Sequence, residues 1–429
     1  MQWIKENLEE YKRAAQLKGI TIDFNYIMEL DEQRKKLLQQ TEELRARRNE
    51  IAQLMRVEVS ESLKSEGKVI KLKIAELEET LHIVQTEYDE LLLRVPNIPA
   101  PDAPVGASDK DNVQIRTWGT PPQFDFEPKD HVELGTALDL LDFETGVKVS
   151  GARGYYLKNE LVLMHMGLVW LGIRAMIKHG FSLHITPTLI RSFALYGTGY
   201  FPFGRDNVYQ ALEAGKTDAQ GGGEQEPLYL AGTSEMSLLA MFQNKTFEEK
   251  DLPVKVSGIS PCYRSEVGSY GKDTKGLYRV HEFFKVEQVM ITRADHAESD
   301  PAFERMLGIA EELLQGLELP YRVVYACTAD MGAGKYKMYD IETWMPSRKS
   351  YGETHSNSHL TDWQARRLNI KYKTADGAAH FVHTLNNTVI AMPRVLIALL
   401  ENNQQADGSV LVPKLLQEFV GKERLEPRS

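Results

Sequence analysis

The stretch CYRSEVGSYGKDTKGLYRVHEFFKVEQV, which runs from Cys262 to Val289, decides the fold predicted for this chain. It concentrates Arg, Lys, His, Glu and Asp side chains around glycines at 268, 271 and 276. From Tyr278 to Glu287 the residues alternate as they do in a β-strand. This alternation predicts that one strand face carries Arg279, His281, Phe283, Lys285 and Glu287.

A strand face with this many ionisable groups needs either water or polar partners. One interpretation is a solvated hairpin at the edge of a sheet. The other is the floor of a site for a charged ligand, in which arginines bind phosphate or carboxylate groups and Phe283 stacks on a flat ring. The stretch by itself leaves both interpretations open.

The composition of the 429-residue chain predicts two domains with a large core. Its formal net charge of −10 argues against a surface that coats nucleic acid, although it allows a local basic patch. The two cysteines, Cys262 and Cys327, lack CxxC spacing, so neither a zinc site nor a disulfide framework is expected.

The N-terminus, MQWIKENLEEYKRA, is charged throughout and does not resemble a signal peptide. The apolar run at 161–177, LVLMHMGLVWLGIRAMI, contains His165 and Arg174 and predicts a buried core helix rather than a membrane span. A reducing, cytoplasmic setting is therefore expected.

Residues from about 26 to 94 carry two heptad patterns, which predict two helices that pair in antiparallel fashion. Between them lies RVEVSESLKSEGK at 56–68, a polar segment with Gly67 in which the chain is expected to reverse. The apolar seam positions are Leu30, Leu37, Leu44 and Ile51 in the first segment, and Ile70, Ile74, Leu77, Leu81, Val84, Tyr88 and Leu91 in the second.

Such a hairpin has little core of its own and is either a dimerisation coiled coil or an arm that touches a large partner. Basic residues are grouped on it, but acidic residues are mixed among them. A linker with prolines at 96, 99, 101 and 104 follows, so the predicted domains are 1–105 and 106–429.

Two stretches look like nucleotide-binding loops but lack essential residues. EAGKT at 213–217 has no first glycine, because position 210 is Gln, and GAGKYK at 332–337 has Tyr where Ser or Thr would reach magnesium. We therefore expect any ATP site to be of neither the P-loop nor the Rossmann type. AGKTDAQGGGEQE at 214–226 predicts a mobile, solvated loop.

Charged residues also mark the predicted starts of two helices. Thr233-Ser234-Glu235 heads one helix, where Thr233 is a suitable N-cap. Arg394 precedes the apolar run VLIALLEN. A cation at a helix N-terminus is slightly unfavourable, unless a bound anion reverses the sign of the interaction.

Together these stretches resemble the seryl-tRNA synthetase family of class II aminoacyl-tRNA synthetases. HGFSLHITPTLI, with Pro187, resembles motif 1, the stretch from Cys262 resembles motif 2, and LNNTVIAMPRVLIALLEN resembles motif 3. The resemblance spans nearly all of the chain. It implies an α+β fold with an antiparallel sheet flanked by helices, plus an N-terminal antiparallel two-helix coiled-coil arm.

The resemblance also implies a homodimer that activates serine with ATP and Mg²⁺ and charges serine tRNA, with selenocysteine tRNA as a further candidate and no zinc. The implied serine-binding residues are Thr233, Ser234, Glu235, Arg264, Glu287 and Thr388. The implied ATP-binding residues are Arg264, Ser265, Glu266, Arg279, Phe283, Glu353, Thr354, His355, Ser356 and Arg394. Glu353 and Ser356 match magnesium-binding positions, Arg264 and Arg394 are the expected catalytic residues, and tRNA binding is expected from Arg45, Arg47, Arg48, Lys68 and Lys71.

The chain departs from the family pattern near the expected site. Motif 3 has Asn387-Thr388-Val389 where Gly-Ser-Gly is common, and Pro393 where Gly is common. His355 stands in a segment that is usually Glu-Ile-Ser-Ser, and His359 replaces a common Asn. Both histidines are expected to be packing substitutions, because no third metal ligand is evident.

Two rival functions remain open from the sequence. One is an amino acid:carrier-protein ligase, although the carrier partner of such an enzyme has no long RNA arm that a helical hairpin could bind. The other is a catalytically inactive RNA-binding relative, although Arg264, Glu287, Glu353 and Arg394 are all retained.

Overall fold

A computed structural model describes residues 1–212, 226–267 and 275–427 of the chain. These residues form two compact units, Met1–Ile98 and Pro99–Ser429, whose boundary falls within the proline-containing segment that was predicted to be a linker. Most of the predicted loop at 214–226, and the glycines at 268 and 271, lie outside the described residues.

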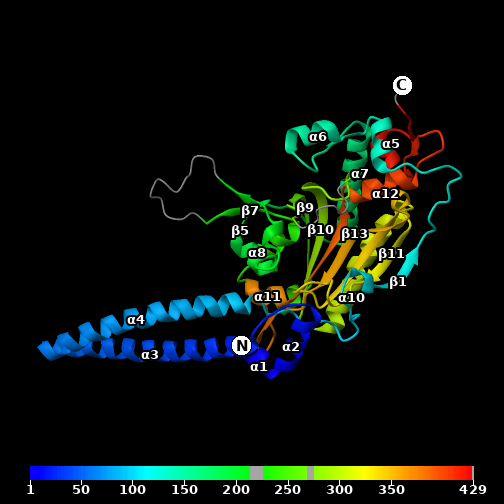
Figure 1. Ribbon diagram of the computed structural model, residues 1–429. Helices are drawn as coiled ribbons and strands as arrows, with labels where there is room; N and C mark the ends of the chain where they lie inside the picture. Colours follow the sequence, from blue (N-terminus) through cyan, green and yellow to red (C-terminus); the bar gives the residue numbers. More distant parts are fainter. Residues whose placement is uncertain (213–225, 268–274, 428–429) are drawn as a thin grey trace. The chain divides into compact units, whose positions relative to one another are not determined.

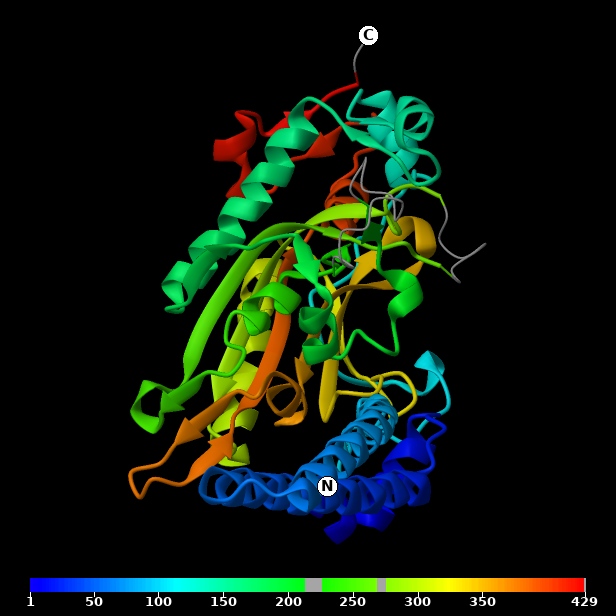
Figure 2. The same ribbon diagram turned by 90° about the vertical axis from the view of Figure 1, so that its left-hand side faces the viewer.

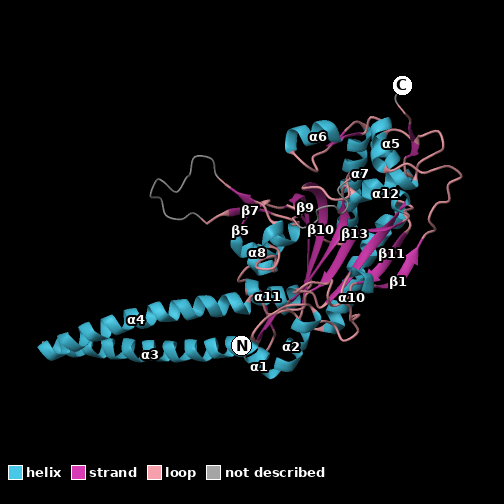
Figure 3. Ribbon diagram, in the orientation of Figure 1, coloured by secondary structure: helices cyan, strands magenta, loops and turns pink. Residues whose placement is uncertain are grey.

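The N-terminal unit consists of helices α1 (Gln2–Glu6), α2 (Leu8–Leu17), α3 (Phe24–Val57) and α4 (Glu61–Leu92). The two long helices, α3 and α4, run side by side as the predicted hairpin (Figure 3). Asp23 caps α3 by accepting hydrogen bonds from the backbone N–H groups of Asn25 and Tyr26. The heptad prediction is confirmed by buried seam residues from both helices, namely Leu30, Ile51, Ile70, Ile74 and Tyr88.

The hairpin turn lies at 58–60, within the segment 56–68 that was predicted to reverse the chain, whereas Gly67 of that segment lies inside α4. One glycine costs a helix about 1 kcal/mol relative to alanine. The seam residues Ile70 and Ile74 and an ion pair between Lys64 and Glu61 (2.7 Å) favour a helix through this segment.

The C-terminal unit is built on an eight-stranded sheet. Figure 1 shows several of its strands, among them β10, β13 and β11, side by side. All neighbouring strands are antiparallel except β4 and β9, so the predicted antiparallel sheet is confirmed. In spatial order the strands are β1 (Val113–Trp118), β11 (Tyr321–Tyr325), β12 (Lys337–Met345), β13 (Ser350–His359), β16 (His383–Ala391), β10 (Glu282–Thr292), β9 (Val254–Tyr263) and β4 (Ser182–Ile185).

Smaller elements surround this sheet. The short strands are β2 (Leu141–Asp142), β3 (Tyr156–Leu157), β5 (Leu189–Arg191), β6 (Gln210–Ala211), β7 (Leu228–Leu230), β8 (Thr246–Glu248), β14 (Lys371–Lys373), β15 (Ala379–Phe381), β17 (Val410–Leu411) and β18 (Arg424–Leu425). The helices are α5 (His131–Ala137), α6 (Phe143–Ser150), α7 (Glu160–Lys178), α8 (Ser192–Thr198), α9 (Ser234–Ala240), α10 (His296–Gly316), α11 (Trp363–Leu368), α12 (Arg394–Asn402) and α13 (Lys414–Val420).

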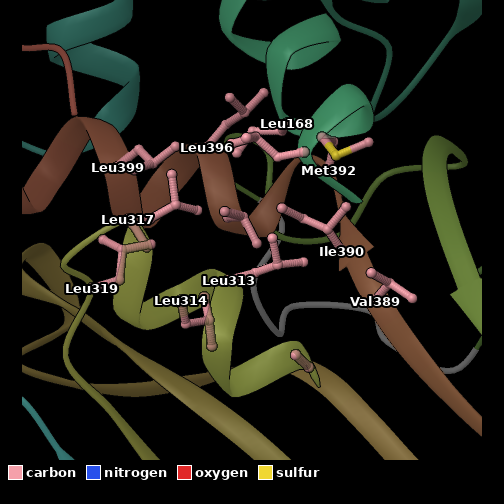
Figure 4. Close-up of a cluster of buried hydrophobic side chains, with 14 of the residues drawn as sticks. Leu168, Leu313, Leu314, Leu317, Leu319, Val389, Ile390, Met392, Leu396 and Leu399 are labelled. Atoms are coloured by element: carbon pink, nitrogen blue, oxygen red, sulfur yellow. The ribbon is translucent and has the colours of Figure 1, made fainter. Parts of the chain in front are cut away.

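The main hydrophobic core lies between one face of the large sheet and the helices α7, α10 and α12. Figure 4 shows Leu168 of α7, Leu313 of α10, Ile390 of β16 and Leu396 of α12 converging there. All but Leu313 are fully buried, and Leu313 is 8 % exposed. Each buried leucine or isoleucine side chain contributes roughly 1.5–3 kcal/mol to folding.

Amide side chains from three neighbouring strands fasten α10 to this face. Gln288 and Asn387 both donate to the carbonyl of Met306, at 2.8 and 2.9 Å, and Asn357 donates to the carbonyl of Phe303 at 2.9 Å. Because strand residues alternate between faces, the neighbouring residues Glu287, Thr388 and Ser356 lie on the opposite face. We call the sheet face that binds α10 the rear face and the opposite face the front face. The rear face therefore anchors the helix, and the front face is free to bind a ligand.

Helix α7 spans the predicted apolar run and crosses the sheet in Figure 2. By length and composition it could cross a membrane, and 44 % of its apolar window is buried inside the protein. The prediction of a buried helix holds for one face alone. On the other face Val162, Leu163, Met166, Trp170 and Ile177 are 41–58 % exposed.

Candidate active site

A cleft of about 450 Å³ opens on the front face of the sheet, and it gathers most of the predicted site residues. The predicted residues that line it are Glu235, Arg264, Glu266, Arg279, Phe283, Glu287, Glu353, Thr354, Ser356, Thr388 and Arg394. Among the described residues, the predicted site residues that do not line the cleft are Thr233, Ser234, Ser265 and His355.

Strand β10 supplies the floor through Phe283, Lys285 and Glu287, as the alternation predicted. The strand begins at Glu282 rather than at Tyr278, so His281 lies outside it. His281 instead holds motif 2 in place, because its Nδ1 lies 3.0 Å from the carbonyl oxygen of Arg264. The solvated-hairpin interpretation is wrong for the floor residues, since Lys285 and Glu287 are 5 % and 2 % exposed.

A buried charge pair lies at the inner end of the floor. The Lys285 ammonium is 2.5 Å from Glu287 Oε2 and donates to Thr233 Oγ1 at 2.8 Å. Burial raises the pKa of Glu287, and the charge and hydrogen bond of Lys285 oppose that rise. Thr388 stands directly opposite Glu287, because a bulge at Val389 shifts the register of the two strands.

A second buried carboxylate, Glu235, is presented by the start of α9. It accepts hydrogen bonds from Gln364 at 2.7 Å and from Asn386 at 2.9 Å. Thr233 caps the helix as predicted, by accepting from the backbone N–H of Glu235. Ser234 points away from the cleft and shares a hydrogen bond with Ser260 at 2.8 Å, which explains why it is not a lining residue.

The guanidinium of Arg264 lies over the ring of Phe283, with Cζ 5.2 Å from the ring centroid, and Nε donates to the carbonyl of Gly232 at 3.4 Å. This hydrogen bond orients the Nε side of the Arg264 guanidinium. Glu266 has a left-handed backbone (φ 51°), and its carboxylate accepts from Arg279 at 3.0 Å. Ser265 lies outside the cleft because its hydroxyl donates to the carbonyl of Asp206 at 2.5 Å.

At the outer end of the cleft Arg394 begins α12, as predicted. Its guanidinium lies over the ring of Tyr278 at 4.5 Å and donates to the carbonyl of Glu353 at 2.9 Å. The Glu353 carboxylate is 3.4 Å away. The cleft thus has one arginine at each end, Arg264 and Arg394.

Strand β13 carries a bulge at Thr354, because Glu342 pairs with Glu353 while Ile341 pairs with His355. Glu353, Thr354 and Ser356 line the cleft as a result. The same geometry turns His355 toward the rear face, where it is 1 % exposed and its Nδ1 lies 2.9 Å from Thr354 Oγ1. This buried position agrees better with the expectation that His355 is a packing substitution than with the expectation that His355 binds ATP.

A buried acid lies beside the Glu353–Ser356 pair. Asp340, on β12, is paired with Ser356 across the strands and is 6 % exposed. Burial, followed by the negative charge of Glu353, raises the pKa of Asp340 well above its ordinary value. Its Oδ1 has no hydrogen-bond partner among the described residues. Hard oxygen donors with an unsatisfied negative charge are a suitable set for a divalent cation.

Several cleft residues were not predicted as site residues, chiefly Lys285, Asn386, Tyr278 and Lys335. Lys285 lay on the face that the alternation selected, so the sequence contained its signal. Lys335 belongs to GAGKYK, which was rejected as a nucleotide-binding loop, yet its side chain reaches the cleft from outside the β-strands. Proximity of this kind depends on tertiary structure.

The motif 3 departures leave the front of the sheet largely unchanged. Asn387 and Val389 face α10, where Asn387 bonds to Met306 and Val389 is fully buried. Thr388 alone of the three lines the cleft. Pro393 also lines it, after a cis peptide bond with Met392. The departures therefore change how the rear face packs more than which groups face a ligand.

In the separate N-terminal unit, two predicted tRNA-binding arginines are engaged with acids. Arg47 pairs with Glu66 and Glu50 at 2.8 Å each, and Arg45 pairs with Glu42 and Glu78 at 2.8 and 2.9 Å. Within the described ranges, the other predicted basic residues have no acidic partner within 4.0 Å and are exposed, namely Arg48, Lys68 and Lys71.

Comparison with known proteins agrees with this architecture. Residues 219–403 match the family described as tRNA synthetase class II core domain (G, H, P, S and T), and residues 1–99 match the seryl-tRNA synthetase N-terminal domain. The serine–tRNA ligase of Rubrobacter xylanophilus is 42 % identical over 431 residues, which cover 100 % of this chain and 99 % of that protein. That of Dictyoglomus turgidum is 41 % identical, with 99 % and 98 % coverage.

Among solved structures, the seryl-tRNA synthetase of Pyrococcus horikoshii complexed with ATP matches with a TM-score of 0.86 and 37 % identity, over 100 % of this chain and 99 % of that one. The fold and the cleft thus define a class II aminoacyl-tRNA synthetase. Within that class, the chain belongs to the seryl-tRNA synthetase family.

Proposed function

We propose that this chain is a serine–tRNA ligase, which uses ATP to form seryl-adenylate and then transfers the seryl group to serine tRNA. In the first step a serine carboxylate oxygen attacks the α-phosphorus of ATP, the bond to the β-phosphate breaks, and pyrophosphate leaves. In the second, a terminal ribose hydroxyl of the tRNA attacks the seryl carbonyl, and AMP leaves. Selenocysteine tRNA is a further candidate substrate.

The observation that carries this proposal is the polarity gradient along one cleft. Its inner end is a buried set of hydroxyl and carboxylate groups, and arginines flank the space outward from it. Arg264 is placed to bridge the serine carboxylate and the α-phosphate, two anions that otherwise repel each other. Because the attacking carboxylate is already ionised, the chemistry requires placement and charge neutralisation rather than a general base.

Serine selection is assigned to Glu287, with Thr388 opposite it and Glu235 beside it. A carboxylate at Glu287 accepts hydrogen bonds from both the ammonium and the hydroxyl group of serine. Alanine would leave that buried acceptor unpaired, and sites of this kind reject such analogues by about 10⁴-fold. Threonine retains the hydroxyl but carries an extra methyl group. Overpacking by that methyl group should weaken the binding of threonine by ~1–3 kcal/mol.

ATP is assigned to the outer cleft, where Phe283 stacks on the adenine ring, Glu266 lies near its amino group, and Arg279 and Arg394 bind the phosphates. Glu353 and Ser356, with the buried Asp340 behind them, are suited to hold Mg²⁺, which supplies charge neutralisation for the phosphates when bound. The protein groups orient the nucleotide, and Pro393 closes the wall beside Arg394.

The helical hairpin, within the proposed domain 1–105, is assigned to tRNA binding through its basic residues. The exposed Arg48, Lys68 and Lys71 are its best-supported contacts, while Arg45 and Arg47 would first have to release their acids. A stiff arm recognises RNA by shape and phosphate positions rather than by base sequence.

We further propose a homodimer in the cytoplasm. The exposed apolar face of α7 continues at β4, where Ile185 is 89 % exposed. Soluble monomers rarely expose a contiguous apolar surface of this kind, so a second copy of the chain is its natural cover. Sedimentation analysis should give a dimer, and Trp170→Glu should shift it toward monomer.

ATP–pyrophosphate exchange across a panel of amino acids tests the proposal. Serine should support exchange, and alanine and glycine should not. Exchange with glycine or alanine in place of serine would identify a carrier-protein ligase instead. Failure of every amino acid, with tRNA binding retained, would identify an inactive RNA-binding relative.

A further inference from the structure

A cluster of histidines lies on the rear face of the sheet, away from the cleft, where three elements meet. His296 is the first residue of α10, His359 is the last of β13, and His383 is the first of β16. The three rings lie 5.3–5.7 Å apart between centroids. Asp300, one helical turn after His296, is on the same side of α10 and reaches the same space.

The donor atoms of His296, Asp300 and His359 have the spacing of a metal site. His296 Nδ1 is 3.2 Å and His359 Nε2 is 3.6 Å from Asp300 Oδ1, and one possible ligand atom from each residue lies within 4.8 Å of the others. In a tetrahedral site with metal–ligand bonds of about 2.0–2.2 Å, neighbouring ligand atoms are roughly 3.3–3.6 Å apart. The two distances to Asp300 match the edges of such a tetrahedron.

Burial provides a second, independent observation. The His359 side chain is 0 % exposed, and its Nε2 has no hydrogen-bond partner among the described residues, although it faces Asp300. A buried nitrogen in that state is costly and needs a partner.

The hydrogen bonds of the rings define where protons must go. The Thr361 backbone N–H donates to His359 Nδ1 at 3.0 Å, so the neutral ring carries its proton on Nε2. A metal ion at Nε2 requires that proton to move to Nδ1, with loss of the Thr361 bond. His383 needs no such change, because its Nδ1 faces Ser299 Oγ at 3.1 Å and that hydroxyl donates to the carbonyl of Asp295.

We propose that His296, Asp300 and His359 bind one divalent transition-metal ion of the zinc class. Two imidazoles with one carboxylate suit Zn²⁺ and Co²⁺ far better than Mg²⁺. His296 is exposed, which gives the ion a path of entry. Such an ion would tie the start of α10 to the end of β13 and so stabilise the fold.

No third ligand for His359 was evident from the sequence, because the partners of His359 lie some 60 positions upstream in a different element. His296 and Asp300 have the i, i+4 spacing common on helix surfaces, which by itself indicates nothing. The sheet register brings them to His359. The expectation that the chain uses no zinc rested on that missing ligand and on two cysteines without CxxC spacing.

Cobalt(II) titration of the full-length, chelator-treated protein tests the proposal, with excess Mg²⁺ present to occupy oxygen-ligand sites. One equivalent should bind with the visible absorption of a tetrahedral nitrogen–oxygen site, and Zn²⁺ should displace it and raise the melting temperature. His296→Asn and Asp300→Asn should each weaken binding by at least ~10-fold. Both positions are at the surface end of the cluster, so circular dichroism should show an intact fold.

The matched control is His82→Asn, which removes an exposed histidine from the separate N-terminal unit and should leave binding unchanged. Absence of binding at tens of micromolar Co²⁺ would overturn the proposal. So would a stoichiometric site that survives both cluster substitutions, or thiolate-to-metal absorption indicating Cys262 or Cys327. Serine-dependent pyrophosphate exchange is measured separately, so failure of the metal site leaves the proposed function untouched.

Discussion

The helical arm and the catalytic sheet use charge in opposite ways. On the arm, acids and bases lie at the surface and pair with neighbours one turn away or across the hairpin, as Arg45 and Arg47 do. In the cleft, Lys285 and Glu287 are almost completely buried and face each other at 2.5 Å. Exposed pairs contribute little and are easily exchanged for a ligand's phosphates. Buried pairs define a site into which a charged substrate must fit.

The largest effect should come from the cleft. Arg264→Ala removes the group that we propose neutralises two approaching anions, and it should lower serine-dependent pyrophosphate exchange by about 10³-fold or more. Exchange kinetics measure the loss. Arg116→Ala removes an exposed arginine from the edge strand β1, and its exchange rate should remain within about twofold of the parent's. Comparable losses of exchange activity in both variants would contradict the proposed role of Arg264 in neutralising the reacting anions.

The next effect should separate the two units. Deleting about residues 40–84 shortens the hairpin and should reduce tRNA charging by about 100-fold or more, because phosphate contacts are lost. Pyrophosphate exchange should stay within a few-fold of the parent. Binding of tRNA to the intact protein should weaken steeply with salt. Normal charging by the shortened protein would end the tRNA-binding assignment of the arm.

A smaller effect should appear in pH dependence. Lys285→Met removes the cation that opposes the raised pKa of Glu287, so that pKa should rise further. In the proposed function the Glu287 carboxylate binds serine, so activity should be lost as pH falls through the pKa of Glu287. The acidic limb of the exchange profile should therefore move to higher pH in the variant, with about a 10-fold loss at neutral pH. An unshifted limb would show that Lys285 does not control Glu287.

The smallest effect should come from the rear face. Asn387→Ala removes the hydrogen bond to Met306 and should lower the free energy of unfolding by about 1 kcal/mol. Urea denaturation measures it. Because Asn387 faces away from the cleft, the KM for serine should remain within about threefold. A large change in KM with unchanged stability would place Asn387 in serine recognition instead.

Local patterns predicted the arm well, and they predicted individual pieces of the cleft. Heptad spacing identified both long helices and the segment between them in which the chain turns, although Gly67 of that segment belongs to the second helix. Strand alternation identified Phe283, Lys285 and Glu287 as one face. It could not show that Thr354 is a bulge, which sends His355 to the rear, nor that Lys335 and Asn386 converge on the cleft. Those facts depend on pairing between distant strands.

The amides that fasten α10 have a consequence for how this fold can change over time. A slip of one residue in β10, β16 or β13 would bring Glu287, Thr388 or Ser356 against the helix and push the amides into the cleft. The back of the sheet therefore fixes the alignment of strands independently of the ligand. Side chains on the front can then be replaced during evolution, and new amino acids or inhibitors accommodated, while the framework keeps its alignment.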